Sequence, residues 1–149
     1  MPKKTTSTET EIASTGREVA ARWTPLLAEQ GWTPVCNFFL LNYHRLDVTH
    51  GEAMVIIHIL AYKWDSVAPF PALKTIGAQM GISASSVRTH LRNLQNKGLI
   101  FREMQIGTTN RFHLQNLFLK LEELLYKDKT EKAKLAAARS VSHSGRPPF

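Results

Sequence analysis

Residues 72–94, ALKTIGAQMGISASSVRTHLRNL, have the pattern of a helix-turn-helix. Gly77 lies four positions before Gly81, and apolar residues flank the two glycines: Ile76, Met80, Ile82 and Val87. Gly81 can adopt the positive φ of a tight turn, and Gly77 allows the second helix to approach closely. Ser83 is placed to cap that second helix. The pattern therefore predicts two helices joined by a short turn at Gly81.

The second of these helices has one apolar and one polar face. Val87, Leu91 and Leu94 recur at i, i+4 and i+7, which predicts a buried stripe. At about 100° per residue, the opposite face holds Ser85, Arg88, Thr89, Arg92 and Asn96, with Asn93 at its margin. Arginine can donate two hydrogen bonds to guanine, asparagine can pair with adenine, and hydroxyls can bind phosphate. We expect DNA contacts led by Arg88, Thr89 and Arg92, the alternative being a merely solvated face.

A β-hairpin is expected after this helix. Gly98 can end the helix, and two strand-like runs, LIFREMQ and RFHL, then flank the Gly-containing turn IGTTN. Arg102 and Arg111 can reach the DNA backbone or minor groove from the strands, and the hairpin tip consists of Thr108, Thr109 and Asn110. The alternative is a hairpin that only closes the core through Ile100, Met104, Phe112 and Leu114.

Positive charge is concentrated in this part of the chain. The formal net charge of the 149 residues is +7, and residues 71–114 hold six cations against a single anion, Glu103. Residues 31–70 carry one net negative charge. Such a distribution suits a phosphate-bearing partner. The predicted DNA-binding set is Lys74, Ser85, Ser86, Arg88, Thr89, Arg92, Asn93, Asn96, Lys97, Arg102, Thr108, Thr109, Asn110 and Arg111.

The N-terminal half supplies a flexible segment and a core helix. Residues 1–16 have almost no apolar content and are expected to be disordered, and Pro25 should interrupt a short, weakly docked helix between 18 and 29. Residues 31–46 predict a short packed helix. Thr49 and Glu52 have the spacing of a capping box, so a core helix should begin at about Gly51. A further helix is expected from about Pro71 to Met80.

An amphipathic helix should close the domain. Leu114, Leu117, Phe118, Leu121, Leu124 and Leu125 recur at helical spacing up to residue 126. This face packs either on the same domain or, as we favour, on a second copy through Leu117, Leu121, Leu124 and Leu125. Beyond it, residues 127–149 are basic and end in Ser, Gly and Pro. The expected organisation is a flexible segment with a short helix at 1–30, one domain at 31–126, and a basic flexible tail, helical at most through Ala138, at 127–149.

The sequence does not indicate a membrane protein, a secreted protein, a metal site or an enzyme. No run approaches the roughly 20 apolar residues of a membrane span, and no secretory signal is visible, so a cytoplasmic protein is expected. Cys36, the single cysteine, has apolar neighbours and is expected to be a small buried filler. No two histidines have the i, i+4 spacing of a helical metal pair, and nucleotide-binding and hydrolase motifs are absent. We therefore predict no enzyme activity, no metal and no cofactor.

A family resemblance rests on three blocks: PFPALKTIGAQMGIS (69–83), SVRTHLRNLQNKGLI (86–100) and TNRFHL (109–114). Residues from about Trp32 to Leu121 resemble the winged helix-turn-helix domains of bacterial, plasmid and phage DNA-binding proteins. Similar domains stand at the front of replication initiators and replisome organisers, and alone as short regulators. The resemblance implies a mainly α fold with a small hairpin. His90 departs from it, because that position is usually aliphatic: either the ring packs edge-on in the core or the helix is rotated.

Three functions compete at this stage. The first is a dimeric, sequence-specific regulator or mobile-element adaptor that binds double-stranded DNA, with half-sites about one helical turn apart. The second is a replication-initiation or partition accessory whose tails recruit a protein partner. The third is a winged-helix protein-interaction module, which the clustered arginines disfavour.

Overall fold

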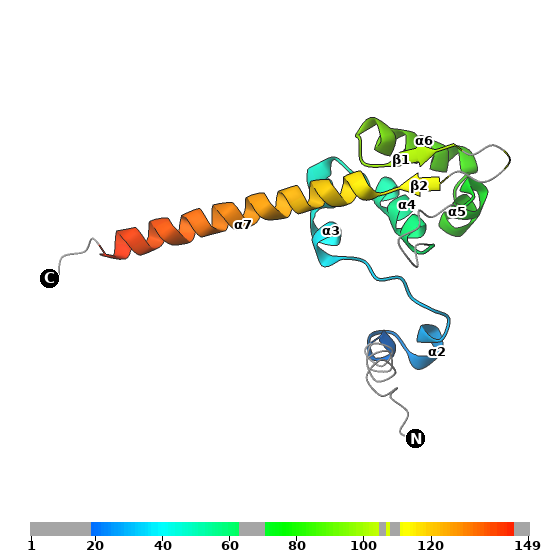
Figure 1. Cartoon of the computed structure of the whole chain (residues 1–149). Helices are drawn as coiled ribbons and strands as arrows, with labels where there is room; N and C mark the ends of the chain where they lie inside the picture. The colour runs from blue at the N-terminus through cyan, green and yellow to red at the C-terminus, as the bar shows by residue number, and fades with distance from the viewer. Residues whose placement is uncertain (1–18, 63–70, 105–106, 108–110, 145–149) are drawn as a thin grey trace, which may run out of the picture. The chain divides into compact units, whose positions relative to one another are not determined.

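The computed structural model describes residues 19–62, 71–104, 107 and 111–144, and Figure 1 shows the order of the elements. The chain divides into two units, Met1–Pro34 and Val35–Phe149. The first contains the short helix α2 (Pro25–Ala28). The second contains α3 (Asn37–Asn42), the 3₁₀ helix η1 (Tyr43–Leu46), α4 (His50–Leu60), α5 (Leu73–Met80), α6 (Ala84–Asn96), β1 (Phe101–Glu103), β2 (Arg111–His113) and α7 (Gln115–Ser144). The mainly helical architecture with one small hairpin agrees with the prediction.

Helix α4 lies at the centre of the second unit. Its start is fixed by the predicted capping box: the backbone N–H of Glu52 donates to Thr49 Oγ1 at 3.2 Å, and the N–H of Thr49 donates to Glu52 Oε2 at 3.3 Å. These bonds satisfy two backbone donors that a helix start leaves free. The core is formed by buried side chains from α4 and its neighbours, among them Val55, Ile56, Ile59, Ile76, Val87, Leu91, Leu94, Leu99, Phe112 and Leu117.

The connection between α5 and α6 has the predicted geometry. Gly81 follows α5 with φ +69°, a conformation that residues with a Cβ rarely adopt. A Cβ on Gly77 would lie 2.8 Å from the carbonyl oxygen of Ile82, so only glycine permits this close approach of the turn. Ser83 Oγ accepts a hydrogen bond from the backbone N–H of Ser86 at 3.1 Å and caps α6. Helix α5 begins at Leu73 with Ala72 as its N-cap, so Pro71 precedes the helix rather than opening it.

Strands β1 and β2 pair antiparallel, with Phe101 opposite His113 and Glu103 opposite Arg111. Phe112 is buried, so the hairpin closes one side of the core. The predicted tip residues Thr108, Thr109 and Asn110 lie outside the described residues.

Helix α7 packs on the domain through its first turns and then continues. Leu114 and Leu117 are buried, and the N–H of Leu117 donates to the carbonyl of Leu99 at 3.1 Å. Leu117 was predicted to contact a second copy, and this prediction is wrong because the core of its own domain already encloses it. The helix runs on to Ser144, past the expected helix end at 126 and the limit of Ala138. No helix within the described ranges has the length and apolar content needed to cross a bilayer.

Between residues 19 and 34, the described part of the first unit, every residue is exposed or half-buried. Residues 19–22 are helical, the helix breaks before Pro25, and α2 then starts with Thr24 as its cap. The predicted interruption at Pro25 is therefore confirmed. Helix α2 contains no buried residue, and Trp23 is 71% exposed. Residues 1–16, which were predicted to be disordered, lie outside the described part of the chain.

Candidate nucleic-acid interface

Helix α6 presents the predicted polar face to solvent. Val87, Leu91 and Leu94 are buried, and the residues of the opposite face are all exposed: Ser85, Arg88, Thr89, Arg92, Asn93 and Asn96. Within the described residues, neither Arg88 nor Arg92 forms an ion pair. Their guanidinium groups thus keep their donors available. Lys74 of α5 is exposed as well.

Two hydroxyls of this face are partly used within the helix. Thr89 Oγ1 donates to the carbonyl of Ser85 at 3.1 Å, which still leaves its oxygen able to accept. Ser86 Oγ lies 2.9 Å from the capping Ser83 Oγ. Ser86 therefore belongs structurally to the N-terminal cap of α6, although its side chain remains exposed.

His90 packs against the start of α4. A Cβ on Gly51 would lie 2.7 Å from His90 Cε1, so the imidazole occupies the space that the missing side chain leaves. The buried stripe of Val87 and Leu91 on either side of His90 remains in register. The unusual histidine thus reflects a close contact with a glycine rather than a rotated helix, and the predicted exposed face is unchanged.

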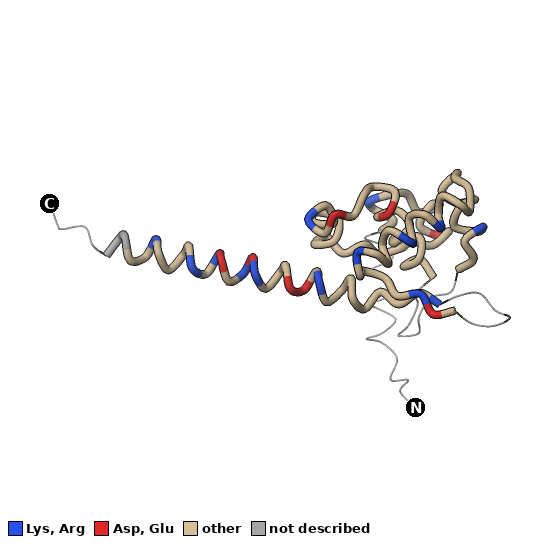
Figure 2. The backbone as a smooth tube through the Cα atoms, turned by 90° about the horizontal axis from the view of Figure 1, so that it is seen from above, with Lys and Arg blue, Asp and Glu red and all other residues tan. Residues whose placement is uncertain are grey.

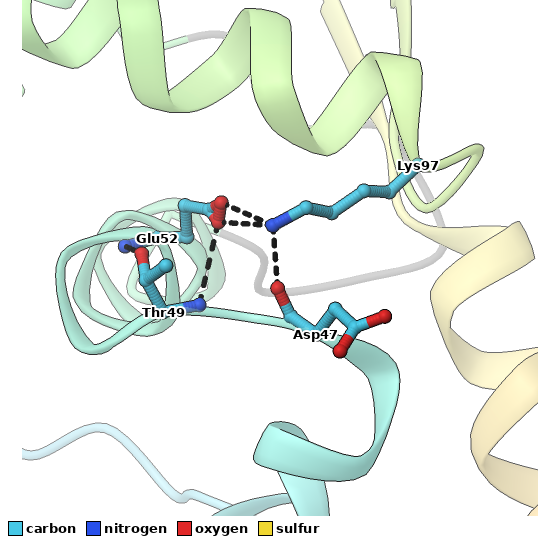
Figure 3. A network of polar contacts seen from close by, with 4 residues as sticks. All are labelled: Asp47, Thr49, Glu52 and Lys97. Atoms are coloured by element: carbon cyan, nitrogen blue, oxygen red, sulfur yellow. Dashed lines mark hydrogen bonds and ion pairs between the residues drawn. The ribbon is translucent and has the colours of Figure 1, made fainter.

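Lys97, predicted to contact DNA, has its ammonium in an internal network (Figure 3). Its Nζ lies 2.6 and 2.8 Å from the two carboxylate oxygens of Glu52 and also donates to the carbonyl of Asp47. Lys120 Nζ donates to the carbonyl of Lys97 at 3.1 Å. All three donors of the Lys97 ammonium have an acceptor available in the folded chain. Its physical role is to neutralise Glu52.

This network joins the C-terminus of α6 to the N-terminus of α4. Glu52 is 1% exposed, and a buried carboxylate needs both a counter-charge and hydrogen bonds. Lys97 is the C-cap of α6, and its side chain supplies that charge. Sequence reasoning recognised Glu52 only as a helix cap. A signal was present, because a glutamate in the first turn of a broadly apolar helix must find a cation.

The hairpin arginines are less accessible than those of α6. Arg102 and Arg111 are half-buried, and Glu103 lies directly opposite Arg111 in the strand register. Glu103 Oε2 contacts His113 Nε2 at 2.9 Å on the same hairpin. The acid lowers the local positive potential around the strands, whereas α6 contains no acidic residue.

An apolar groove opens between α3, α4 and α7. Its volume is about 290 Å³, and it is lined by Cys36, Phe38, Phe39, Ile56, Leu60, Leu117, Phe118, Leu121, Glu122 and Leu125. Cys36 is exposed at this groove, which corrects the prediction of a buried filler. The same helices expose Leu40 and Leu41 on α3 and Leu119 and Tyr126 on α7.

An ion pair holds α7 against η1 at the edge of the domain. Arg45 donates two hydrogen bonds to Asp128, from Nη1 at 2.7 Å and from Nη2 at 2.9 Å. The hydrogen bonds from Arg45 lower the pKa of the Asp128 carboxyl, and those same bonds raise the pKa of Arg45. Two-point pairing of this kind fixes orientation as well as distance.

In the described parts of the chain, no three His, Cys, Asp or Glu side chains gather as they would around a metal ion.

Comparison with known proteins places this arrangement in a family. Residues 35–133 match the DnaD N-terminal domain. The structure is similar to the crystal structure of the N-terminal domain of DnaD protein from Geobacillus kaustophilus HTA426, with 25% sequence identity, a TM-score of 0.57, and coverage of 78% of this chain and 96% of that chain. A comparison with curated proteins found no match. Because the family match spans well over half of its residues, the chain belongs to the DnaD N-terminal domain family.

Proposed function

We propose that this chain is a replication accessory that binds double-stranded DNA through the exposed face of α6. The observation that carries the proposal is the exposure of Arg88 and Arg92, free of ion pairs in the described residues, on a helix that holds no acid. Donors of this kind suit base edges and phosphates. The function is one of binding rather than catalysis.

The proposed mode of binding is that of a winged helix-turn-helix. The order α5, turn at Gly81, α6 and hairpin supports it, with α6 as the recognition helix and the hairpin as the wing. The proposed DNA-contacting set then consists of Lys74, Ser85, Ser86, Arg88, Thr89, Arg92, Asn93, Asn96, Arg102 and Arg111, with Thr108, Thr109 and Asn110 at the wing tip. Lys97 is left out because Glu52 and Asp47 take up its ammonium.

Membership of the DnaD N-terminal domain family favours replication over transcriptional regulation. Domains of this type are associated with organising the replisome. A protein in such a role marks a site on DNA and contacts other proteins.

A protein-interaction function is a second proposal, and the groove between α3 and α7 favours it. We propose that a second copy covers this face, with Leu121 and Leu125 from the groove and Leu124 beside them, to form a homodimer. Exposed Leu40 and Leu41 enlarge the apolar area beyond isolated surface residues. The extensions at both ends would recruit further proteins.

Selection of random duplex DNA by the purified chain tests the primary proposal. Enriched duplexes are then titrated at several salt concentrations. An enriched site with a steep salt dependence, roughly 0.9 in log–log slope per phosphate neutralised, is the expected result. Failure of the chain to bind any duplex, even at low salt, would refute DNA binding and leave the protein-interaction function.

A further inference from the structure

We propose that α7, where it leaves the core of its domain, carries a second DNA-binding surface, a basic stripe formed by Lys129 and Lys132, that contacts phosphates of the duplex bound by α6. This inference rests on the proposed DNA binding and adds to it a separate contact surface. Every residue from Lys129 to Val141 is exposed, and Lys129 and Lys132 form no ion pair in the described residues. The helix is therefore exposed to solvent along this length.

The stripe continues the face by which α7 packs on its domain. With about 3.6 residues per turn, Leu114, Leu117, Leu121 and Leu125 share one side of the helix, and the same side continues through Asp128 and Lys132. Arg45 takes up the charge of Asp128, and Lys129 lies beside Lys132. A face that is apolar over the domain thus becomes basic where the domain ends.

The charge of α7 changes along its length (Figure 2). Charges of both signs alternate around the middle of the helix, and the charged residues toward its C-terminal end are Lys and Arg. The last acid of the chain is Glu131, which flanks the stripe close to Arg45. Ala133, Ala136 and Ala137 follow, and such short side chains allow a helix to approach a duplex closely. Arg139 falls on the same face as Lys132.

A nucleic acid fits this surface better than the alternatives. Leu135 and Val141 are the large apolar residues exposed between Lys129 and Val141, and they supply too little area for insertion into a membrane interface. Pairing of Lys129 and Lys132 with the same two lysines of a second copy would place like charges together. Binding to the phosphate backbone requires only exposed cations that can reach the phosphates. The same backbone is already the proposed partner of α6.

The test compares two double variants of the full chain that remove equal charge. Lys129→Gln/Lys132→Gln alters the stripe, and Lys127→Gln/Lys134→Gln removes two exposed lysines from the opposite side of the same helix. Duplex binding is measured by fluorescence anisotropy at several salt concentrations, with circular dichroism to confirm equal helix content. The stripe variant should lower the slope of log K against log salt by about 1.8. The control variant should change the slope much less.

Equal slopes for the two variants would overturn the inference, because the helix would then act only by diffuse attraction. Anionic phosphatidylserine vesicles provide a second probe. If the stripe variant loses vesicle binding while its DNA slope stays at the parent value, the surface belongs to a membrane and the inference fails. Arg92→Ala separates this outcome from failure of the proposed function. If Arg92→Ala weakens binding and the stripe variant does not differ from its control, only the stripe is refuted.

Discussion

Lys97 and Glu52 lie 45 residues apart in sequence, and the Lys97 ammonium contacts both carboxylate oxygens of Glu52, at 2.6 and 2.8 Å. The carboxylate also completes the capping box at the start of α4. Glu52 therefore caps the N-terminus of α4 and binds the side chain of Lys97 at the C-terminus of α6. The pair thus links the C-terminal end of α6 to the N-terminal end of α4.

Loss of the cation should destabilise the domain. Lys97→Met leaves Glu52 buried without its counter-charge, and we expect unfolding in urea to show a loss of about 2–3 kcal/mol. The double variant Lys97→Met/Glu52→Gln removes the buried charge as well and should recover part of that loss. Recovery would be absent if Lys97 acted only through packing of its alkyl chain.

The same variant distinguishes an internal role of Lys97 from a DNA contact. At a temperature where Lys97→Met is fully folded, its salt dependence of duplex binding should equal that of the parent. A slope lower by about 0.9 would show that the ammonium does neutralise a phosphate, as the sequence alone predicted.

Gly51 and His90 should be energetically coupled. Gly51→Ala places a methyl group 2.7 Å from His90 Cε1, so the ring must move; because these atoms are the far end of a flexible side chain, the cost in thermal or urea unfolding should be only about 1 kcal/mol. In Gly51→Ala/His90→Ala the space is restored, and alanine is the better helix former. A double-mutant cycle should give a measurable interaction energy, and additive effects would contradict the contact.

The Arg45–Asp128 pair should make the docking of α7 depend on pH. The pKa of Asp128 is lowered in the folded chain, so its contribution to stability is present above the ordinary value of 3.8 and is lost as the pH falls through the lowered pKa. Asp128→Asn should therefore be less stable than the parent at neutral pH and equal to it in strong acid. Thermal unfolding across this pH range measures the difference, with Glu123→Gln as a control for an exposed acid on the same helix.

The pair is exposed, so the effect should be small and should weaken with salt. A gap between parent and Asp128→Asn that persists unchanged in acid would show that the pair does not stabilise the fold.

Local patterns predicted the local parts of this fold. The Thr49 and Glu52 capping box and the turn at Gly81 follow from short-range chemistry, and both occur as expected. The exposed side of α6 was also predictable, because a single apolar stripe fixes which side faces outward. These elements need no knowledge of distant residues.

The sequence-based predictions failed where contacts between residues distant in sequence determine the structure. The partner of Lys97 lies on another helix: the sequence around Glu52 indicates that a cation is needed, but no local pattern identifies Lys97 as that cation. Cys36 has apolar neighbours in sequence, yet it lies exposed at an open groove. Helix α7 was expected to extend at most through Ala138, but alanine and lysine are good helix formers and the helix continues to Ser144. A replication role was predicted only as an alternative to a regulator, because the same winged-helix pattern occurs in proteins of several functions.

Binding of one enriched duplex by the parent, Arg92→Ala and Lys127→Ala tests the central claim most directly, with competitor duplexes that vary one base pair at a time. Arg92→Ala should lose about 1–3 kcal/mol of binding free energy and relax base preference at one position, whereas Lys127→Ala should retain the parent's preference. Equal affinity and equal preference for the parent and Arg92→Ala would contradict the assignment of α6 as the DNA-binding surface.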